Sequence, residues 1–227
     1  MTLVDLIPIA LLGGVLGLDV VSFPQAMISR PLVAATLGAG LVGQAAMGLF
    51  LGVALELIAL ETLPFGASRY PEWGSAAVVG GAIFAAHPTQ PAGAMTLAIL
   101  AALATTWVGG WSMVKLRQLN GVWAARRRAA LEAGARGTVI SLQLMGMTAD
   151  LVRGTLLTAI AYALLAPIAN LSIEHWSTDA RVSRAIVVAA AASVAGGAAW
   201  KIFHSTVGAR WFFFGGLAIG LFLLFVK

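Results

Sequence analysis

The sequence predicts an all-α, polytopic integral membrane protein with broken, re-entrant helical hairpins. Of its 227 residues, 60% are apolar and only 10% are charged, whereas soluble domains have about 45–50% apolar and about 25% charged residues. The apolar residues form long runs separated by short polar gaps, which is typical of membrane-spanning helices. Several runs are rich in glycine or too short to span, and such interruptions are tolerated only in protein-buried or water-lined positions.

The same composition excludes other classes of protein. A soluble fold of this length cannot bury so much apolar surface, which argues against a soluble enzyme and a nucleic-acid-binding domain. The chain has no cysteine, which excludes disulfides, thiolate zinc sites and cysteine catalysis. Its three histidines, His87, His175 and His204, lie far apart and lack metal-ligand spacing. We therefore expect no cofactor, no metal, no catalytic residue and no nucleic-acid partner.

The N-terminal third contains one candidate span and two broken apolar runs. Residues 6–21 form the first apolar segment, and because residues 1–5 carry no Lys or Arg we expect no cleavable signal peptide. Residues 32–64 are too long for one straight span and too short for two, so they predict two half-spans or a span with a re-entrant arm. Residues 75–86 predict another half-helix. Paired interruptions of this kind, here within a 32–88 hairpin region, indicate a transport site.

The next segments combine a full span with a basic stretch. Residues 92–114 are long enough to cross a bilayer. Residues 115–136 then carry a net charge of +5, which equals that of the whole chain. Short basic loops stay in the cytoplasm, so we expect a cytoplasmic loop here. Contact between Arg126–Arg128 and anionic lipid is the alternative interpretation.

The remaining apolar segments predict further helices in a single membrane domain covering residues 1–227. No linker or shift in composition indicates a second domain. The segments are residues 139–147, 151–173, 185–200 and 211–226. The glycine pairs Gly13–Gly17 and Gly48–Gly52 have the small-xxx-small spacing that lets helix backbones approach closely.

Glu56 is the most informative polar residue, because it lies in an apolar run with no Lys or Arg within four positions. An ionised carboxylate near the bilayer centre costs at least ~2.5 kcal/mol, so it usually faces a cavity or a partner. Two interpretations remain open. Glu56 accepts hydrogen bonds from a polyhydroxylated or cationic ligand, or it is a protonated glutamate bonded to a neighbouring helix.

Other polar residues could join such a site. Glu72 follows Pro71 in a polar turn and suits sugar hydroxyls, although a solvated loop acid is the alternative. Asp19, Gln25, Ser29 and Arg30 form a second polar group, in which Arg30 is either an interface anchor or the partner of an intramembrane carboxylate.

Residues 19–79 resemble the IIC membrane component of the mannose/fructose/sorbose family of the bacterial phosphoenolpyruvate:sugar phosphotransferase system. The resemblance is carried by residues 29–43 (SRPLVAATLGAGLVG), 48–60 (GLFLGVALELIAL) and 63–79 (LPFGASRYPEWGSAAVV). The positions that match the family pattern are Arg30, Pro31, Leu32, Gly43, Gly48, Gly52, Glu56, Gly66, Ala67 and Pro71. Beyond this third of the chain, only length, hydropathy and the central basic stretch agree.

Three positions depart from the family pattern. Gln44 stands where the family usually has aspartate, Glu72 also replaces an aspartate, and Glu61 replaces a common glycine. The loss of one charge and the shift of another carboxylate bear on which sugar is bound.

The resemblance implies a sugar-translocating subunit of the bacterial inner membrane, without a catalytic residue of its own. Such a subunit binds a hexose-like sugar and delivers it to a soluble IIB protein, which is phosphorylated by IIA. A IID membrane chain is the implied partner, and trimers of the IIC–IID pair are the implied assembly. The expected sugar-binding residues are Glu56, Glu72, Asp19, Gln25, Gln44 and Ser68.

Two alternatives come from other classes of protein. A non-transporting scaffold or sensor could keep the fold without turnover, as the changes at Gln44 and Glu61 suggest. A membrane-embedded enzyme is disfavoured, because the sequence lacks a nucleophile–base pair and metal-ligand spacing.

Overall fold

The computed structural model describes residues 3–60, 71–89, 91–175, a few positions between 181 and 196, and 208–225. Its regular elements over these ranges are all helices, which confirms the all-α prediction. They are α1 (Leu3–Asp19), α2 (Pro31–Leu41), α3 (Ala45–Leu60), α4 (Trp73–Ala85), α5 (Pro91–Arg126), α6 (Arg128–Glu132), α7 (Arg136–Glu174) and α9 (Ala209–Phe225).

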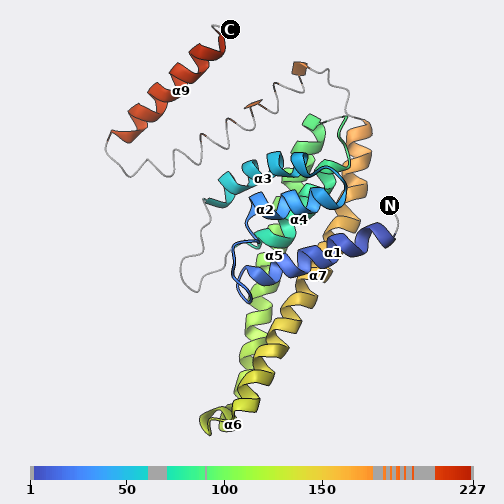
Figure 1. The fold of residues 1–227 in the computed structure, drawn as a ribbon, viewed down its shortest axis with the longest axis vertical. Helices are drawn as coiled ribbons and strands as arrows, with labels where there is room; N and C mark the ends of the chain where they lie inside the picture. The colour runs from blue at the N-terminus through green and yellow to red at the C-terminus, as the bar shows by residue number, and fades with distance from the viewer. Residues whose placement is uncertain are drawn as a thin grey trace.

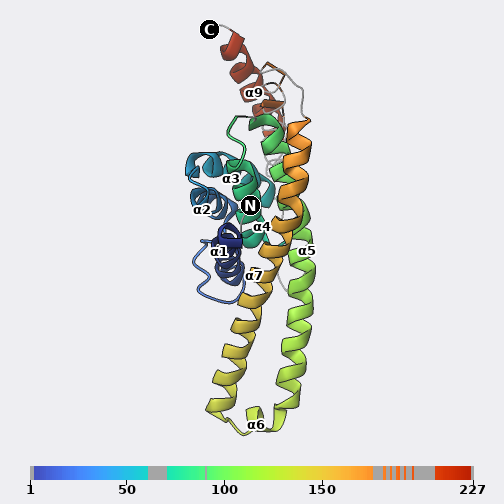
Figure 2. The ribbon, with the colours of Figure 1, turned by 90° about the vertical axis from the view of Figure 1, so that its right-hand side faces the viewer.

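Two long helices, α5 and α7, run side by side along the length of the molecule and are joined at one end by α6 (Figures 1 and 2). They contain 36 and 39 residues, so they measure about 54 and about 58 Å at the rise of an α-helix. A hydrocarbon core is about 30 Å thick. Both helices are apolar enough to cross it, and both are long enough to extend well beyond it.

Two sequence-based boundaries were wrong in this region. The expected loop 115–136 is mostly helical, because α5 continues to Arg126 and α6 follows directly. The segments 139–147 and 151–173 are parts of one helix, α7. At the boundary predicted between these segments, Asp150 and Arg153 form an ion pair three residues apart on one continuous helix.

Three short helices, α2, α3 and α4, form a cluster that contacts this pair mainly through α4. Helices α2 and α3 are the two short segments predicted within 32–64, and they are joined by a turn in which Gly43 has a φ of 82°. Pro31 occupies the first position of α2. A backbone N–H at this position has no partner within the helix, so proline loses no hydrogen bond there. Helix α4, the predicted half-helix, contacts α1, α2, α3, α5 and α7 and is buried along its whole length. The short helices measure about 16 to 24 Å, so none alone spans a bilayer.

Glycines let these short helices touch backbone to backbone. A Cβ on Gly38 of α2 would lie 2.6 Å from the Val78 carbonyl oxygen and 2.9 Å from Val78 Cα on α4. A Cβ on Gly52 of α3 would lie 2.9 Å from Leu32 Cα. The packing role predicted for Gly52 is therefore confirmed, and Gly38 acts in the same way between α2 and α4.

We expect Gly38→Ala to destabilise the protein by about 1–3 kcal/mol, the usual effect of overpacking. The added methyl group meets backbone atoms of a fully buried helix, which cannot move aside. Gly40→Ala is the matched control, because its Cβ would meet only Ala45 Cβ, at 3.8 Å, on an exposed face. Thermal unfolding in nanodiscs measures both variants, and a Gly38→Ala protein as stable as Gly40→Ala would contradict the packing argument.

Candidate functional site

The turn between α1 and α2 is held by the carboxylate of Asp19. This side chain is only 2% exposed. Its Oδ1 accepts a hydrogen bond from the Ala26 N–H at 2.7 Å, and its Oδ2 accepts one from the Ser29 N–H at 2.9 Å. Both oxygens therefore bind the backbone. Gln25 lies exposed in the same turn with a φ of 57°, and its amide donates to the Val21 carbonyl.

Glu56 of α3 forms an ion pair with Arg30, the residue before α2. Its second oxygen accepts the backbone N–H of Leu32 at 3.2 Å, so the carboxylate also caps the start of α2. The side chains of Arg30 and Glu56 remain 34% and 19% exposed. The sequence left two roles open for Arg30, an interface anchor or the partner of a carboxylate within the apolar segments. The structure shows the second role.

Gln44 does not join this pair in the structure. Gln44 lies exposed in the turn between α2 and α3. Arg30 precedes the other end of α2, about 16 Å away by the rise of the helix. Ser68 falls in residues 61–70, outside the described part of the chain.

Glu72 is fully buried, which rules out the solvated loop acid that its turn suggested. It caps α4, since its Oε1 accepts the Ser75 N–H at 3.0 Å. Its backbone is bound twice to Thr106 of α5, whose hydroxyl donates to the Glu72 carbonyl at 2.8 Å. The other carboxylate oxygen, Oε2, is buried and has no hydrogen-bond partner among the described residues.

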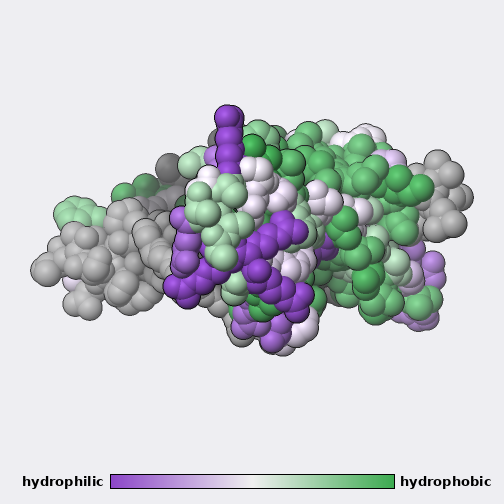
Figure 3. All heavy atoms as spheres, turned by 90° about the horizontal axis from the view of Figure 1, so that it is seen from below, coloured by the Kyte–Doolittle hydropathy of each residue, from purple (hydrophilic) through white to green (hydrophobic). Residues whose placement is uncertain are grey.

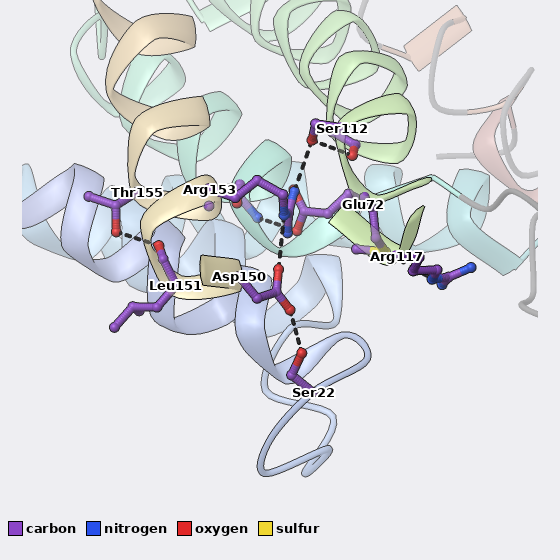
Figure 4. A network of polar contacts seen from close by, with 12 residues as sticks. Ser22, Glu72, Ser112, Arg117, Asp150, Leu151, Arg153 and Thr155 are labelled. Atoms are coloured by element: carbon purple, nitrogen blue, oxygen red, sulfur yellow. Dashed lines mark hydrogen bonds and ion pairs between the residues drawn. The ribbon is translucent and has the colours of Figure 1, made fainter. Parts of the chain in front are cut away.

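A second set of polar side chains, buried or half-buried, lies next to Glu72 (Figure 4). Arg153 of α7 donates from Nε to Asp150 Oδ1 at 2.9 Å and from Nη1 to Ser112 Oγ on α5 at 3.1 Å. The Ser22 hydroxyl donates to the other oxygen of Asp150. Sequence reasoning missed this network. The available signal was a pair of opposite charges three residues apart within an apolar region.

Glu72 and Arg153 both lie close to Gly17 of α1. A Cβ added to Gly17 would lie 3.4 Å from Glu72 Oε1 and 3.7 Å from Arg153 Nη2. Arg153 Nη2, like Glu72 Oε2, is buried without a partner among the residues that the structure describes. One acceptor and one donor among the described residues thus remain without a partner, and a hydroxyl group can satisfy either of them because it both donates and accepts.

Short helices packed around buried polar groups, beside two membrane-length helices, define a class of polytopic membrane protein. In this class, interrupted helices build a transport site within the membrane.

The chain belongs to the family described as the PTS system sorbose-specific IIC component, whose model matches residues 3–224. It is therefore a sugar-translocating membrane subunit of a phosphotransferase system. This confirms the resemblance found in the sequence.

Solved structures share the fold. One, described as "Structure of membrane protein", is 19% identical with a TM-score of 0.71 and covers 100% of this chain and 92% of its own. Another is the mannose transporter ManYZ in complex with microcin E492, at 18% identity and a TM-score of 0.61. That alignment covers 97% of this chain and 87% of the other. The comparison with curated proteins gave no match.

Proposed function

We propose that this chain binds a hexose-like sugar within the bacterial inner membrane and delivers it to a soluble IIB protein for phosphorylation. The observation that carries the proposal is the partly exposed Arg30–Glu56 pair, which lies where α2 begins beside α3. A carboxylate accepts hydrogen bonds and a guanidinium donates them. Neighbouring sugar hydroxyls can use both, so the pair offers a sugar complementary partners.

The charge of the pair also suits an uncharged substrate. Arg30 and Glu56 neutralise each other, so a sugar can bind against the intact pair without leaving an unpaired charge in the membrane. Asp19 and Gln25 shape the turn that leads into Arg30 and form the wall of the site. Glu72 has one carboxylate oxygen that no described residue binds and that a sugar hydroxyl can use. We also propose that Gln44 and Ser68 contact the sugar at a different stage of transport.

The proposed partners are the other proteins of a sugar phosphotransferase system. The mannose transporter ManYZ has a similar fold, and we propose a IID membrane chain as the partner of this chain, in trimers of the pair. Soluble IIA and IIB proteins supply the phosphoryl group. We place the basic end of α5 and α7, with residues 115–136, in the cytoplasm, because short basic segments stay on that side.

Membrane vesicles test this function directly. They contain this chain with a IID partner and are loaded with phosphoenolpyruvate, its phosphotransferase, the phosphocarrier protein that this phosphotransferase phosphorylates, and the IIA and IIB proteins. We expect external L-sorbose or D-mannose to accumulate inside as sugar phosphate. Vesicles that lack only this chain are the control. If no hexose of a broad panel is phosphorylated or bound, the chain is a non-transporting scaffold or sensor instead.

A further inference from the structure

A cavity of about 360 Å³ lies between α5 and α7, apart from the Arg30–Glu56 pair. Its lining includes Ser22 from the α1–α2 turn, Asn120 and Trp123 from α5, and Gln143, Gly146 and Met147 from α7. Small-molecule sites occupy about 300–1,000 Å³. The cavity is thus large enough for a small ligand.

The lining has the chemistry of a site for an uncharged polyol. It combines a hydroxyl, two carboxamides and an indole ring, and none of its residues is charged. Carboxamides both donate and accept hydrogen bonds, as sugar hydroxyls do. The indole provides an apolar face with a polar N–H, which suits a ring that has both C–H and O–H groups. A phosphorylated sugar would find no cation in this lining.

One polar atom of the lining lacks a partner. Asn120 Oδ1 is buried and accepts no hydrogen bond from the described residues. Gly146 stands opposite this amide, since a Cβ there would lie 3.5 Å from Asn120 Nδ2 and 3.7 Å from Oδ1. Buried polar atoms without a partner are rare, and each calls for an explanation. A hydroxyl group of a ligand would supply the missing donor.

The position of the cavity relates it to the transport path. It lies on the part of α5 and α7 that leads to α6, and hydrophilic side chains gather at that end of the molecule (Figure 3). Ser22 belongs both to the cavity and to the buried network, because its hydroxyl donates to Asp150, the partner of Arg153. The cavity therefore adjoins the Asp150–Arg153 network, on the side of the molecule that carries the basic residues 115–136.

We propose that this cavity is a second sugar subsite, which holds the unphosphorylated sugar on the basic side after it leaves the Arg30–Glu56 pair. The inference rests on the proposed function, because it names a further binding site for the same substrate. Selectivity for a neutral sugar over its phosphate follows from the uncharged lining.

A single introduced cysteine tests the subsite, since the natural chain has none. The Met147→Cys protein, in nanodiscs with its IID partner, is labelled with a small maleimide in the presence of L-sorbose or D-mannose. At a sugar concentration about ten times the dissociation constant, labelling is expected to slow by about tenfold, because only about a tenth of the sites remain free. Val122→Cys is the matched control, since Val122 is exposed on α5 but does not line the cavity. Its labelling is expected to stay unchanged.

A second variant checks that protection arises in the cavity. Gly146→Leu in the Met147→Cys background fills the space beside Asn120 and replaces a helical glycine with a better helix former. The sugar is expected to give no protection in this protein, while its circular dichroism spectrum remains helical. Protection that survives Gly146→Leu would overturn the proposal.

The outcomes separate the subsite from the proposed function. Equal labelling of Met147→Cys with and without sugar, in a protein that still supports sugar phosphorylation, overturns the subsite and leaves the function standing. Protection of Met147→Cys that persists when Glu56→Gln lowers uptake supports a separate subsite. Protection of Met147→Cys and Val122→Cys alike points to a global change in the protein and contradicts the proposal.

Discussion

Replacing Arg153 with methionine is expected to destabilise the protein by about 3–5 kcal/mol, the usual effect of removing one partner from a buried ion pair. Arg153 is the cation that faces two carboxylates, Asp150 and Glu72, which are 1% and 0% exposed. Without it, Asp150 loses an ion pair and Ser112 loses a donor. Unfolding of the purified variant in nanodiscs, by heat or by added SDS, measures the effect.

Two further variants make this prediction specific. Arg128→Met removes an arginine that is 79% exposed and pairs with Glu132, so it should change stability by no more than about 1 kcal/mol. Asp150→Asn in the Arg153→Met background should recover part of the lost stability, because it removes a buried charge that no longer has its partner. An Arg153→Met protein that unfolds like the wild type would show that the network contributes nothing to the fold.

Sugar uptake is expected to fall by about 10- to 100-fold in Glu56→Gln, and further in Glu56→Ala. Hydrogen bonds to charged groups are worth about 1.5–3 kcal/mol, and each 1.4 kcal/mol is a factor of ten in affinity. Glutamine keeps the size of the side chain and an acceptor for the Leu32 N–H, so the start of α2 is retained. Initial rates of radiolabelled sugar uptake, normalised to the amount of protein in the membrane, measure the change.

The double variant Arg30→Gln/Glu56→Gln separates a sugar contact from a purely structural ion pair. If Glu56 only neutralises Arg30, removing both charges restores uptake, because no unpaired charge remains. If Glu56 binds the sugar, the double variant is folded but still defective. Glu132→Gln is the control for the loss of a carboxylate at an exposed position, and its uptake should equal that of the wild type. Normal uptake by Glu56→Gln would remove Glu56 from the site.

The α1–α2 turn shows how far the candidate site followed from the sequence. Asp19, Gln25 and Arg30 were recognised as one polar group, because they lie close together along the chain. The separate role of each of these residues could not be predicted from the sequence. In the structure, Asp19 binds the backbone of the turn, whereas Arg30 reaches a carboxylate 26 residues away. A polar residue in an apolar segment predicts that a partner exists, but only the packing of helices selects which one.

The sequence by itself determined the class of the protein and the presence of short apolar helices. Hydropathy acts locally, and a lipid environment requires each segment to satisfy its own backbone, so α1 and α4 could be placed within a few residues. The division of residues 32–64 into α2 and α3 was left open. The tertiary structure alone decided that Glu72 is buried and that Ser22 and Ser112 meet α7, over separations of 128 and 41 residues. Such contacts arise when helices pack, because the free energy of burying a polar group depends on the partners that packing brings to it.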